Sequence, residues 1–183
     1  LMKILTGFYQ RDKGEILFEG KPLDTHSIQA VIKQGISMIY QELNPIEGMS
    51  VAENIFCGKE LCKVNMLYVD QKKMNQKASE LLEKLGIQNM KPTDKLRSLS
   101  NAQKQLVEIA KAISNNSKLI IMDEPTSAIT EAECQRLFKT IRQLRSEGIS
   151  FIYITHKMDE IFQLCDEVTV MRDGKYVATK SVS

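Results

Sequence analysis

Short apolar segments alternate with helical patterns along much of this chain. Residues 36–40, 119–122 and 150–155 are apolar runs of the length that buried strands usually have, and a helical pattern separates the last two. Strand–helix–strand alternation places successive strands side by side in the same direction. The pattern therefore predicts an α/β fold with a parallel sheet covered by helices on both faces.

The helix between the last two runs has a defined beginning and end. The sequence Thr130-Glu131-Ala132-Glu133 is a capping box, in which a hydroxyl and a carboxylate satisfy backbone N–H groups at the start of a helix. Gly148 suits the end of the same helix. The residues that we expect to face the core are Leu137, Ile141 and Leu144.

The first third of the chain contains shorter elements. Residues 1–6 are typical of the end of a helix that stops at Gly7. Residues 15–19 have an apolar centre between two glycines, which predicts a strand, and residues 27–34 predict a short helix.

The C-terminal segment predicts a β-hairpin. Asp173-Gly174 separates residues 167–172 from residues 175–178, and this dipeptide favours a two-residue turn between antiparallel strands.

Residues 45–112 form a mostly helical segment inside the α/β pattern. Three helix starts are visible in it, at the capping residues Ser50, Asp70 and Ser100. The last of them begins a helix over residues 101–114, and we expect the segment to be an inserted helical subdomain. The expected buried stripe of that last helix consists of Ala102, Leu106, Ile109 and Ile113.

Composition fits one globular domain. The chain has 183 residues, of which 43% are hydrophobic and 26% are charged, and its formal net charge is +2. A charge so close to neutral gives no electrostatic argument for binding nucleic acid. No apolar run approaches the roughly 20 residues that span a bilayer, so we expect any association with a membrane to pass through a partner.

Two adjacent carboxylates end the most apolar of the predicted strands. Asp123 and Glu124 follow residues 119–122 and precede Pro125. Phosphoryl transfer from ATP requires a ligand for Mg²⁺ and a group that orients the attacking water. Neighbouring residues of a strand point to opposite sides, so the pair can divide these tasks, with Asp123 as the magnesium ligand and Glu124 as the general base. The tripeptide alone is also compatible with a polar strand exit that has no catalytic role.

Gln41 and His156 follow the other two predicted strands directly. In parallel α/β sheets, ligands bind outside the carboxyl ends of the strands, so both side chains are expected near Asp123. His156 can hydrogen-bond the γ-phosphate and help to hold Glu124. Gln41 can contact both Mg²⁺ and the attacking water, as a sensor. For each residue, a purely structural hydrogen bond is the alternative.

The segment Leu99-Ser100-Asn101-Ala102-Gln103 opens the helix over residues 101–114. Helix N-termini bind anions through free N–H groups and the helix dipole. We expect the Ser100 hydroxyl and the Ala102 N–H to point at a phosphate, and we include Gln103 as a nucleotide contact. A plain helix cap is the alternative.

A common phosphate-binding loop ends in Gly-Lys followed by Ser or Thr. The three Gly-Lys pairs of this chain are followed instead by Pro22, Glu60 and Tyr176. We therefore expect these residues to begin downstream of such a loop.

Taken together and in this order, the segments resemble the signature, Walker B and switch-histidine motifs of ABC transporter ATPases. Within that superfamily, the chain is similar to the ATP-binding subunits of monosaccharide importers of the ribose and galactose/methyl-galactoside type. The similarity begins at residues 1–7, continues to residue 173, and is especially close in residues 160–170.

The resemblance implies a P-loop NTPase fold of the RecA-like, ABC ATPase type, truncated at its N-terminus and carrying an inserted helical subdomain. Residues 1–44 are then a partial ATPase core without the Walker A loop. Residues 45–112 are the helical subdomain with the signature motif, and residues 113–183 complete the core with Walker B, the D-loop and the switch histidine.

The resemblance also implies ATP and Mg²⁺ as cofactors, and a tandem polypeptide of which this chain resembles the first ATPase half. ATP would lie between the phosphate loop of one half and the signature of the other. The implied partners are transmembrane permease subunits, a second ATPase half or subunit and, indirectly, a periplasmic or lipoprotein sugar-binding protein, with no nucleic acid. The implied location is the cytoplasmic face of the cell membrane, through the permease.

The chain departs from the family's usual signature at Asn101 and Ala102, where two glycines are common. Alanine keeps the N–H group but limits close approach. Two other functions stay open, namely a soluble ABC ATPase that acts on ribosomes or DNA, and a catalytically inert fragment of an importer subunit. The 183 residues alone are expected to bind ATP weakly and to hydrolyse it negligibly.

Overall fold

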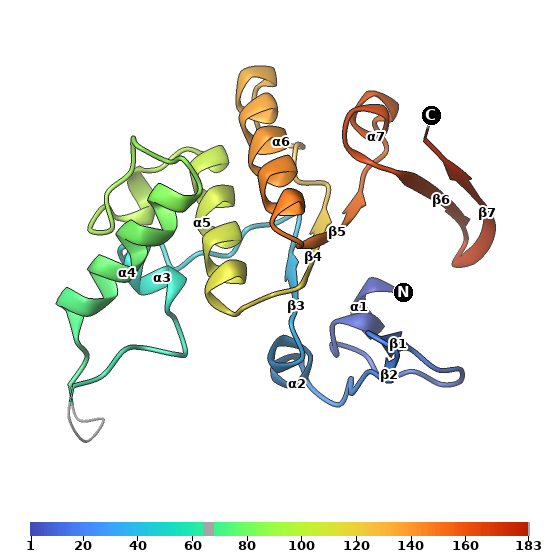
Figure 1. Ribbon diagram of the computed structural model, residues 1–183, viewed down its shortest axis with the longest axis horizontal. Helices are drawn as coiled ribbons and strands as arrows, with labels where there is room; N and C mark the ends of the chain where they lie inside the picture. The colour runs from blue at the N-terminus through green and yellow to red at the C-terminus, as the bar shows by residue number, and fades with distance from the viewer. Residues whose placement is uncertain (64–67, 183) are drawn as a thin grey trace.

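A three-stranded parallel sheet lies at the centre of the computed structural model, which describes residues 1–63 and 68–182 (Figure 1). Its strands are β3 (Ile36–Ile39), β4 (Leu119–Asp123) and β5 (Ser150–Ile154), in the order β3-β4-β5. The register pairs Met38 with Ile121 and Ile121 with Ile152. The three predicted strands and their parallel arrangement are therefore confirmed.

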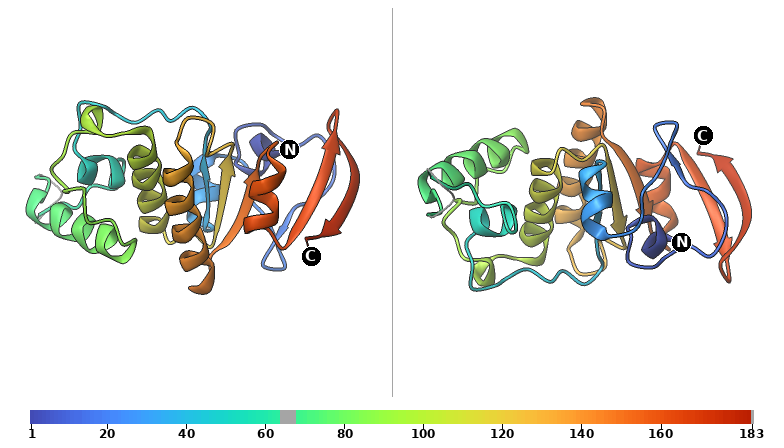
Figure 2. Two further views of the ribbon diagram at one scale, coloured as in Figure 1. Left: turned by 90° about the horizontal axis from the view of Figure 1, so that it is seen from above. Right: turned by 90° about the horizontal axis from the view of Figure 1, so that it is seen from below.

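Each face of the sheet has its own hydrophobic core, because alternate residues of a strand point to opposite sides. Ile120 and Met122 of β4 pack in the larger core with helices α5 (Asn101–Ser114) and α6 (Glu131–Ser146), which lie next to each other in both views of Figure 2. Ile121, between them in the sequence, belongs to a smaller core on the other face. That core contains Leu23 and residues of α1 (Met2–Leu5) and α2 (Ile28–Lys33).

The helical segment consists of α3 (Val51–Ile55), α4 (Gln71–Lys84) and the short 3-10 helix η2 (Leu96–Ser98), which precede α5 in the chain. Side chains of Ser50, Asp70 and Ser100 cap α3, α4 and α5 as predicted. Residues 64–67, which fall inside the predicted subdomain, lie outside the described residues. Within the described ranges, no helix combines the length and the apolar character that crossing a bilayer requires.

The predicted buried stripe of α5 is only partly correct. Ile109 is buried, whereas Ala102, Leu106 and Ile113 are half-buried. Helix α5 packs against α3 and α4 on one side and against β3 and α6 on another. Residues on more than one face of the helix are therefore buried. The residues of α5 that are buried are Gln105, Val107, Ile109, Ala110 and Ala112.

The strand predicted at residues 15–19 is present but shorter than predicted. The structure has a two-residue strand β1 (Leu17–Phe18), which pairs antiparallel with an unpredicted strand β2 (Lys21–Pro22). Glu19 and Gly20, with φ of 51° and 74°, make the tight turn between them. Pro22 has no N–H group with which to extend the pairing.

The predicted C-terminal hairpin is confirmed. Strands β6 (Glu167–Arg172) and β7 (Lys175–Ser181) pair antiparallel, and Asp173 and Gly174 both have positive φ in the connecting turn. A short helix, α7 (Met158–Leu164), precedes the hairpin. This helix was not predicted from the sequence.

Candidate functional site

The carboxyl ends of the three parallel strands bring Gln41, Glu124 and His156 to one edge of the sheet. The register pairs Ile39 with Met122 and Asp123 with Ile154, so the three strands end at nearly the same level of the sheet. These three side chains come from separate segments of the chain and meet as the sequence predicted.

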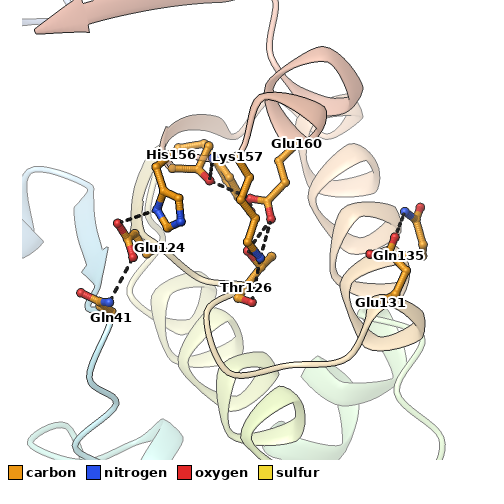
Figure 3. Close-up of polar contacts among 10 residues, drawn as sticks. Gln41, Glu124, Thr126, Glu131, Gln135, His156, Lys157 and Glu160 are labelled. Carbon is orange, nitrogen blue, oxygen red and sulfur yellow. Dashed lines mark hydrogen bonds and ion pairs between the residues drawn. The ribbon is translucent and has the colours of Figure 1, made fainter.

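Glu124 is the centre of this cluster (Figure 3). Its Oε2 accepts a hydrogen bond of 3.1 Å from Nε2 of Gln41, and its Oε1 lies 3.1 Å from Nδ1 of His156. The Glu124 side chain is 30% exposed and that of His156 is 72% exposed. The carboxylate is thus held on both sides while the cluster stays open to a ligand.

The backbone of Glu124 is in the left-handed region, with φ of 44°. This conformation costs a residue with a Cβ about 1 kcal/mol or more, and it persists only where the surroundings enforce it. A hydrogen bond of 2.9 Å from the Glu124 N–H to the Ile154 carbonyl joins this position to β5. The chain therefore turns sharply at the residue whose side chain meets Gln41 and His156.

Asp123 lies beside this cluster, at the end of β4, and is half-buried. Burial raises the pKa of its carboxyl group, the neighbouring Glu124 raises it further, and Lys3 of α1 opposes the shift. A carboxylate with a raised pKa at a strand end favours a cation or a cationic partner, because either would relieve the cost of its charge.

The donors at this edge suit a magnesium ion. Mg²⁺ prefers oxygen ligands, usually one or two carboxylates supplemented by water and phosphate oxygens. Asp123 offers a carboxylate. Gln41 donates a hydrogen bond to Glu124 through its amide nitrogen, so the amide oxygen of Gln41 is available to bind an ion. Across the described ranges, no group of three or more histidine, cysteine or carboxylate side chains could hold a metal ion alone. The residues present fit an ion that arrives together with phosphate oxygens.

Ser100, Ala102 and Gln103 lie at the N-terminus of α5, apart from the strand-end cluster. The Ser100 hydroxyl accepts a hydrogen bond from the Gln103 N–H, and the Gln103 side chain accepts one of 2.9 Å from the Ser100 N–H. The Ser100 hydroxyl also donates to Glu133 of α6 at 3.3 Å. In the described part of the chain, no hydrogen bond joins these residues to Asp123, Glu124 or His156. The helix cap that the sequence left as an alternative is thus present.

A hollow of about 510 Å³ adjoins these residues. It lies between α5, α6 and the end of α4, and Ser100, Ala102, Gln103 and Glu133 contribute to its lining. The N-terminus of α5 is therefore accessible from outside, although Glu133 places a negative charge next to Ser100.

A second groove, of about 330 Å³, lies on the β3 side of the molecule. Its lining comes from α2, β3, α5 and the loop that follows Gln41, and includes Val31, Tyr40, Leu43, Asn44, Lys111 and Asn115. The loop is anchored at its far end by buried Asn54, whose amide group pairs with both the N–H and the carbonyl of Ile46. The groove is thus built from the segment that carries Gln41.

A network around Glu160 was not predicted from the sequence. This buried carboxylate of α7 contacts Thr126, Tyr153, Thr155 and Lys157. The only sequence signal is that Glu160 follows His156 by four residues. That spacing is too common to identify a site.

Comparisons of the sequence with known proteins identify relatives of this chain. A family model described as ABC transporter matches residues 1–127. Over 98% of its length, the chain is 54% identical to a Geobacillus kaustophilus protein that carries the name ribose/galactose/methyl galactoside import ATP-binding protein. Over 100% of its length, it is 47% identical to the Escherichia coli galactose/methyl galactoside import ATP-binding protein MglA. The chain spans 36% of the length of each of these relatives.

Solved structures show the same fold. A nucleotide-free ATP-binding cassette from an ABC transporter superposes with a TM-score of 0.84 at 27% sequence identity, covering 98% of this chain and 74% of that one. The predicted fold class, a P-loop NTPase core of the ABC ATPase type, is therefore confirmed.

Proposed function

The chain belongs to the ABC transporter family, and from that premise we propose that it is part of an ATPase that powers the import of a monosaccharide. The observation that carries the proposal is the cluster of Gln41, Glu124 and His156 beside Asp123 at one edge of the sheet. The import names of relatives at 47–54% identity support the sugar assignment.

In this proposal, Glu124 is the general base that accepts a proton from the attacking water. His156 holds the Glu124 carboxylate and contacts the γ-phosphate, and Gln41 senses whether nucleotide is present. Asp123 and Gln41 would hold Mg²⁺, which supplies charge neutralisation for the transferred phosphoryl group when it is bound. The contacts of Glu124 with both neighbours support these roles, because a base must be oriented before it can act.

We assign Ser100, Ala102 and Gln103 to a nucleotide bound by a second ATPase half or subunit. Two observations support this. These residues make no hydrogen bond to the strand-end cluster within the described residues, and they line an accessible hollow. Ala102 keeps an N–H group for a phosphate, as the anion preference of helix N-termini requires.

We propose that permease subunits dock in the groove beside the loop that follows Gln41. The groove joins residues of the ATPase core to residues of α5, so a helix seated there would contact both parts.

The division of the chain at residues 1–44, 45–112 and 113–183 is part of this proposal, as is a location on the cytoplasmic face of the membrane. A sugar-binding protein would act indirectly, through the permease, and nucleic acid is not a partner.

These 183 residues contain no Gly-Lys-Ser or Gly-Lys-Thr sequence. The backbone and lysine of such a loop hold the β- and γ-phosphates in P-loop enzymes. We therefore propose that the residues studied alone bind ATP weakly and hydrolyse it negligibly. Micromolar ATP affinity of this fragment in calorimetry would contradict that statement.

The decisive experiment uses the polypeptide expressed from the complete reading frame, reconstituted in lipid nanodiscs with candidate sugar-permease subunits of the same organism. ATP hydrolysis should rise when a binding protein loaded with galactose, methyl galactoside or ribose is added. The matched control is the unloaded binding protein. Hydrolysis that responds to ribosomes or DNA, and to none of these sugars, would contradict the proposal and favour a soluble ABC ATPase.

A further inference from the structure

Glu160 joins the two loops that carry Glu124 and His156. It lies in α7, and only 5% of its surface is exposed. Figure 3 shows its carboxylate between Thr126 and Lys157, beside the Glu124 cluster. Its Oε1 accepts from the hydroxyl of Thr126 and pairs with Lys157 at 3.3 Å, and its Oε2 accepts from the hydroxyls of Tyr153 at 2.8 Å and Thr155 at 3.0 Å.

Two donors on each oxygen account for the hydrogen-bonding capacity of a carboxylate. Burial raises the pKa of Glu160, but the hydrogen bonds from Thr126, Tyr153, Thr155 and Lys157 outweigh it and leave the pKa below its usual value. Glu160 is therefore ionised at neutral pH. A buried charge with a complete set of donors holds those donors in place, because moving any one of them leaves the charge under-solvated.

The positions of these donors connect Glu160 to the site. Thr126 is two residues after Glu124, and Thr155 and Lys157 are the residues on either side of His156. Lys157 adds a second link, since its Nζ also donates to the hydroxyl and the carbonyl of Thr126 at 3.2 and 3.3 Å. The Glu124 loop and the His156 loop are thus tied to one common anchor.

We propose that Glu160 is a positioning residue for the ATPase reaction. It acts through Glu124 and His156 by fixing the two loops relative to each other, and it makes no contact with nucleotide. The inference rests on the proposed function of that site. Displacements of about 1 Å at a reacting group can cost about 100-fold in rate, so losing this anchor should lower turnover without changing which groups are present.

The first test compares Glu160→Gln with Asp159→Asn in the polypeptide expressed from the complete reading frame with its permease. Both changes remove one negative charge from the same turn of α7, but Asp159 is exposed. We expect kcat to fall roughly 10- to 100-fold in Glu160→Gln, with the Kd for ATP unchanged, and neither quantity to change in Asp159→Asn. An equal fall in both variants, or a rise in Kd matching the fall in kcat, would overturn the proposal.

A double-mutant cycle separates positioning from general stabilisation of the fold. In a Glu124→Gln background, Glu160→Gln should cause a smaller loss of single-turnover rate than in the wild type, because part of its effect passes through Glu124. A residue that merely supports the fold would lower the rate by the same factor in both backgrounds. That result would contradict the proposal.

Thr126 provides a second pair of variants, in case Glu160→Gln fails to fold. Thr126→Val keeps the shape of the side chain and removes the hydroxyl, whereas Thr126→Ser keeps the hydroxyl. We expect Thr126→Val to lower kcat and Thr126→Ser to retain it. Equal rates in the two variants would show that the hydrogen bond to Glu160 does not position the site.

Amide hydrogen exchange tests the anchor without relying on catalysis. The amides of Glu124, Thr126, Ser127 and residues 155–157 should exchange faster in Glu160→Gln than in Asp159→Asn. If the wild-type protein hydrolyses no ATP, the proposed function fails, yet this measurement still shows whether Glu160 holds the two loops. Identical exchange in the two variants would refute the anchoring.

Discussion

Nδ1 of His156 lies 3.1 Å from Oε1 of Glu124, although the two residues are 32 positions apart in the sequence. The parallel pairing of β4 with β5 produces this contact, since Asp123 is in register with Ile154 and the next residues leave the sheet together. Sheet topology therefore determines which side chains meet, and local sequence determines what chemistry they carry.

Glu124→Gln should abolish most ATP turnover while ATP binding survives. The amide has nearly the same shape as the carboxylate but cannot accept the water's proton, and losing a general base costs about 10²- to 10⁴-fold in rate. Single-turnover hydrolysis and equilibrium binding on the polypeptide from the complete reading frame measure the two effects. Glu131→Gln, an exposed change on α6, is the control. A loss of affinity as large as the loss of rate would make Glu124 a binding residue.

Gln41→Glu should lower the rate of ATP hydrolysis more than Gln41→Met does. The first variant replaces the amide that lies 3.1 Å from Glu124 with a carboxylate. Two like charges at that distance repel each other, so the Glu124 carboxylate should be displaced from the position that it holds beside Gln41 and His156. Gln41→Met removes the hydrogen bond without adding charge. Single-turnover hydrolysis measures both variants, and equal rates would mean that the lost hydrogen bond, and not the charge, is responsible.

Glu160→Gln should lower the free energy of unfolding by about 1–3 kcal/mol at pH 7, because a buried hydrogen-bonded charge is replaced by an amide that cannot accept from all four donors. The pKa of Glu160 is lowered in the folded state, so its contribution is present above the unfolded pKa and is lost as the pH falls through the folded value.

The destabilisation should accordingly shrink as the pH drops below about 4.5, the ordinary value for glutamate. Urea unfolding at pH 7 and at pH 4, with Asp159→Asn as the control, measures it. A destabilisation that is the same at both values would show that the charge of Glu160 is not what stabilises the fold.

Ser100→Arg should prevent the two ATPase halves from closing on ATP without preventing ATP from binding to the half that carries the substitution. The proposal places Ser100 against a nucleotide held by the other half, and a hydrogen bond to a charged group of this kind contributes about 1.5–3 kcal/mol. A larger cationic side chain would fill that space and could pair with Glu133, which Ser100 already contacts. Size-exclusion chromatography with and without ATP, together with nucleotide binding, tests this. A structure of the ATP-bound protein with Ser100 facing its own half's γ-phosphate would contradict it.

Elements fixed by local interactions were predictable from the sequence. The helix predicted over residues 101–114 has those bounds in the structure, because Ser100 and Gln103 determine its start through a capping box. The turn at Asp173-Gly174 was equally predictable, because both positions need positive φ and this dipeptide favours it. Gln41, Glu124 and His156 could be placed together because the strands before them are parallel.

Features that depend on several elements packing at once were not predictable. The burial of α5 follows from neighbours on more than one side, which no single helical period reveals. The pairing of β1 with β2 depends on a turn at Glu19, a residue with no preference for positive φ. The Glu160 network draws on β5, α7 and the loop after β4, so its members share no motif.

The left-handed backbone at Glu124 sets the stability of this position against its proposed activity. A glycine would adopt φ of 44° without strain, yet this position carries the side chain that the proposed reaction needs. The fold therefore retains a conformation that weakens it, at a residue directly after β4 where the proposed activity and stability make opposite demands. Glu124→Gly should produce a protein that unfolds at a higher temperature than Glu124→Ala, although both lack the carboxylate. Selection for stability alone would favour glycine at position 124, and that change would remove the carboxylate that the proposed site needs.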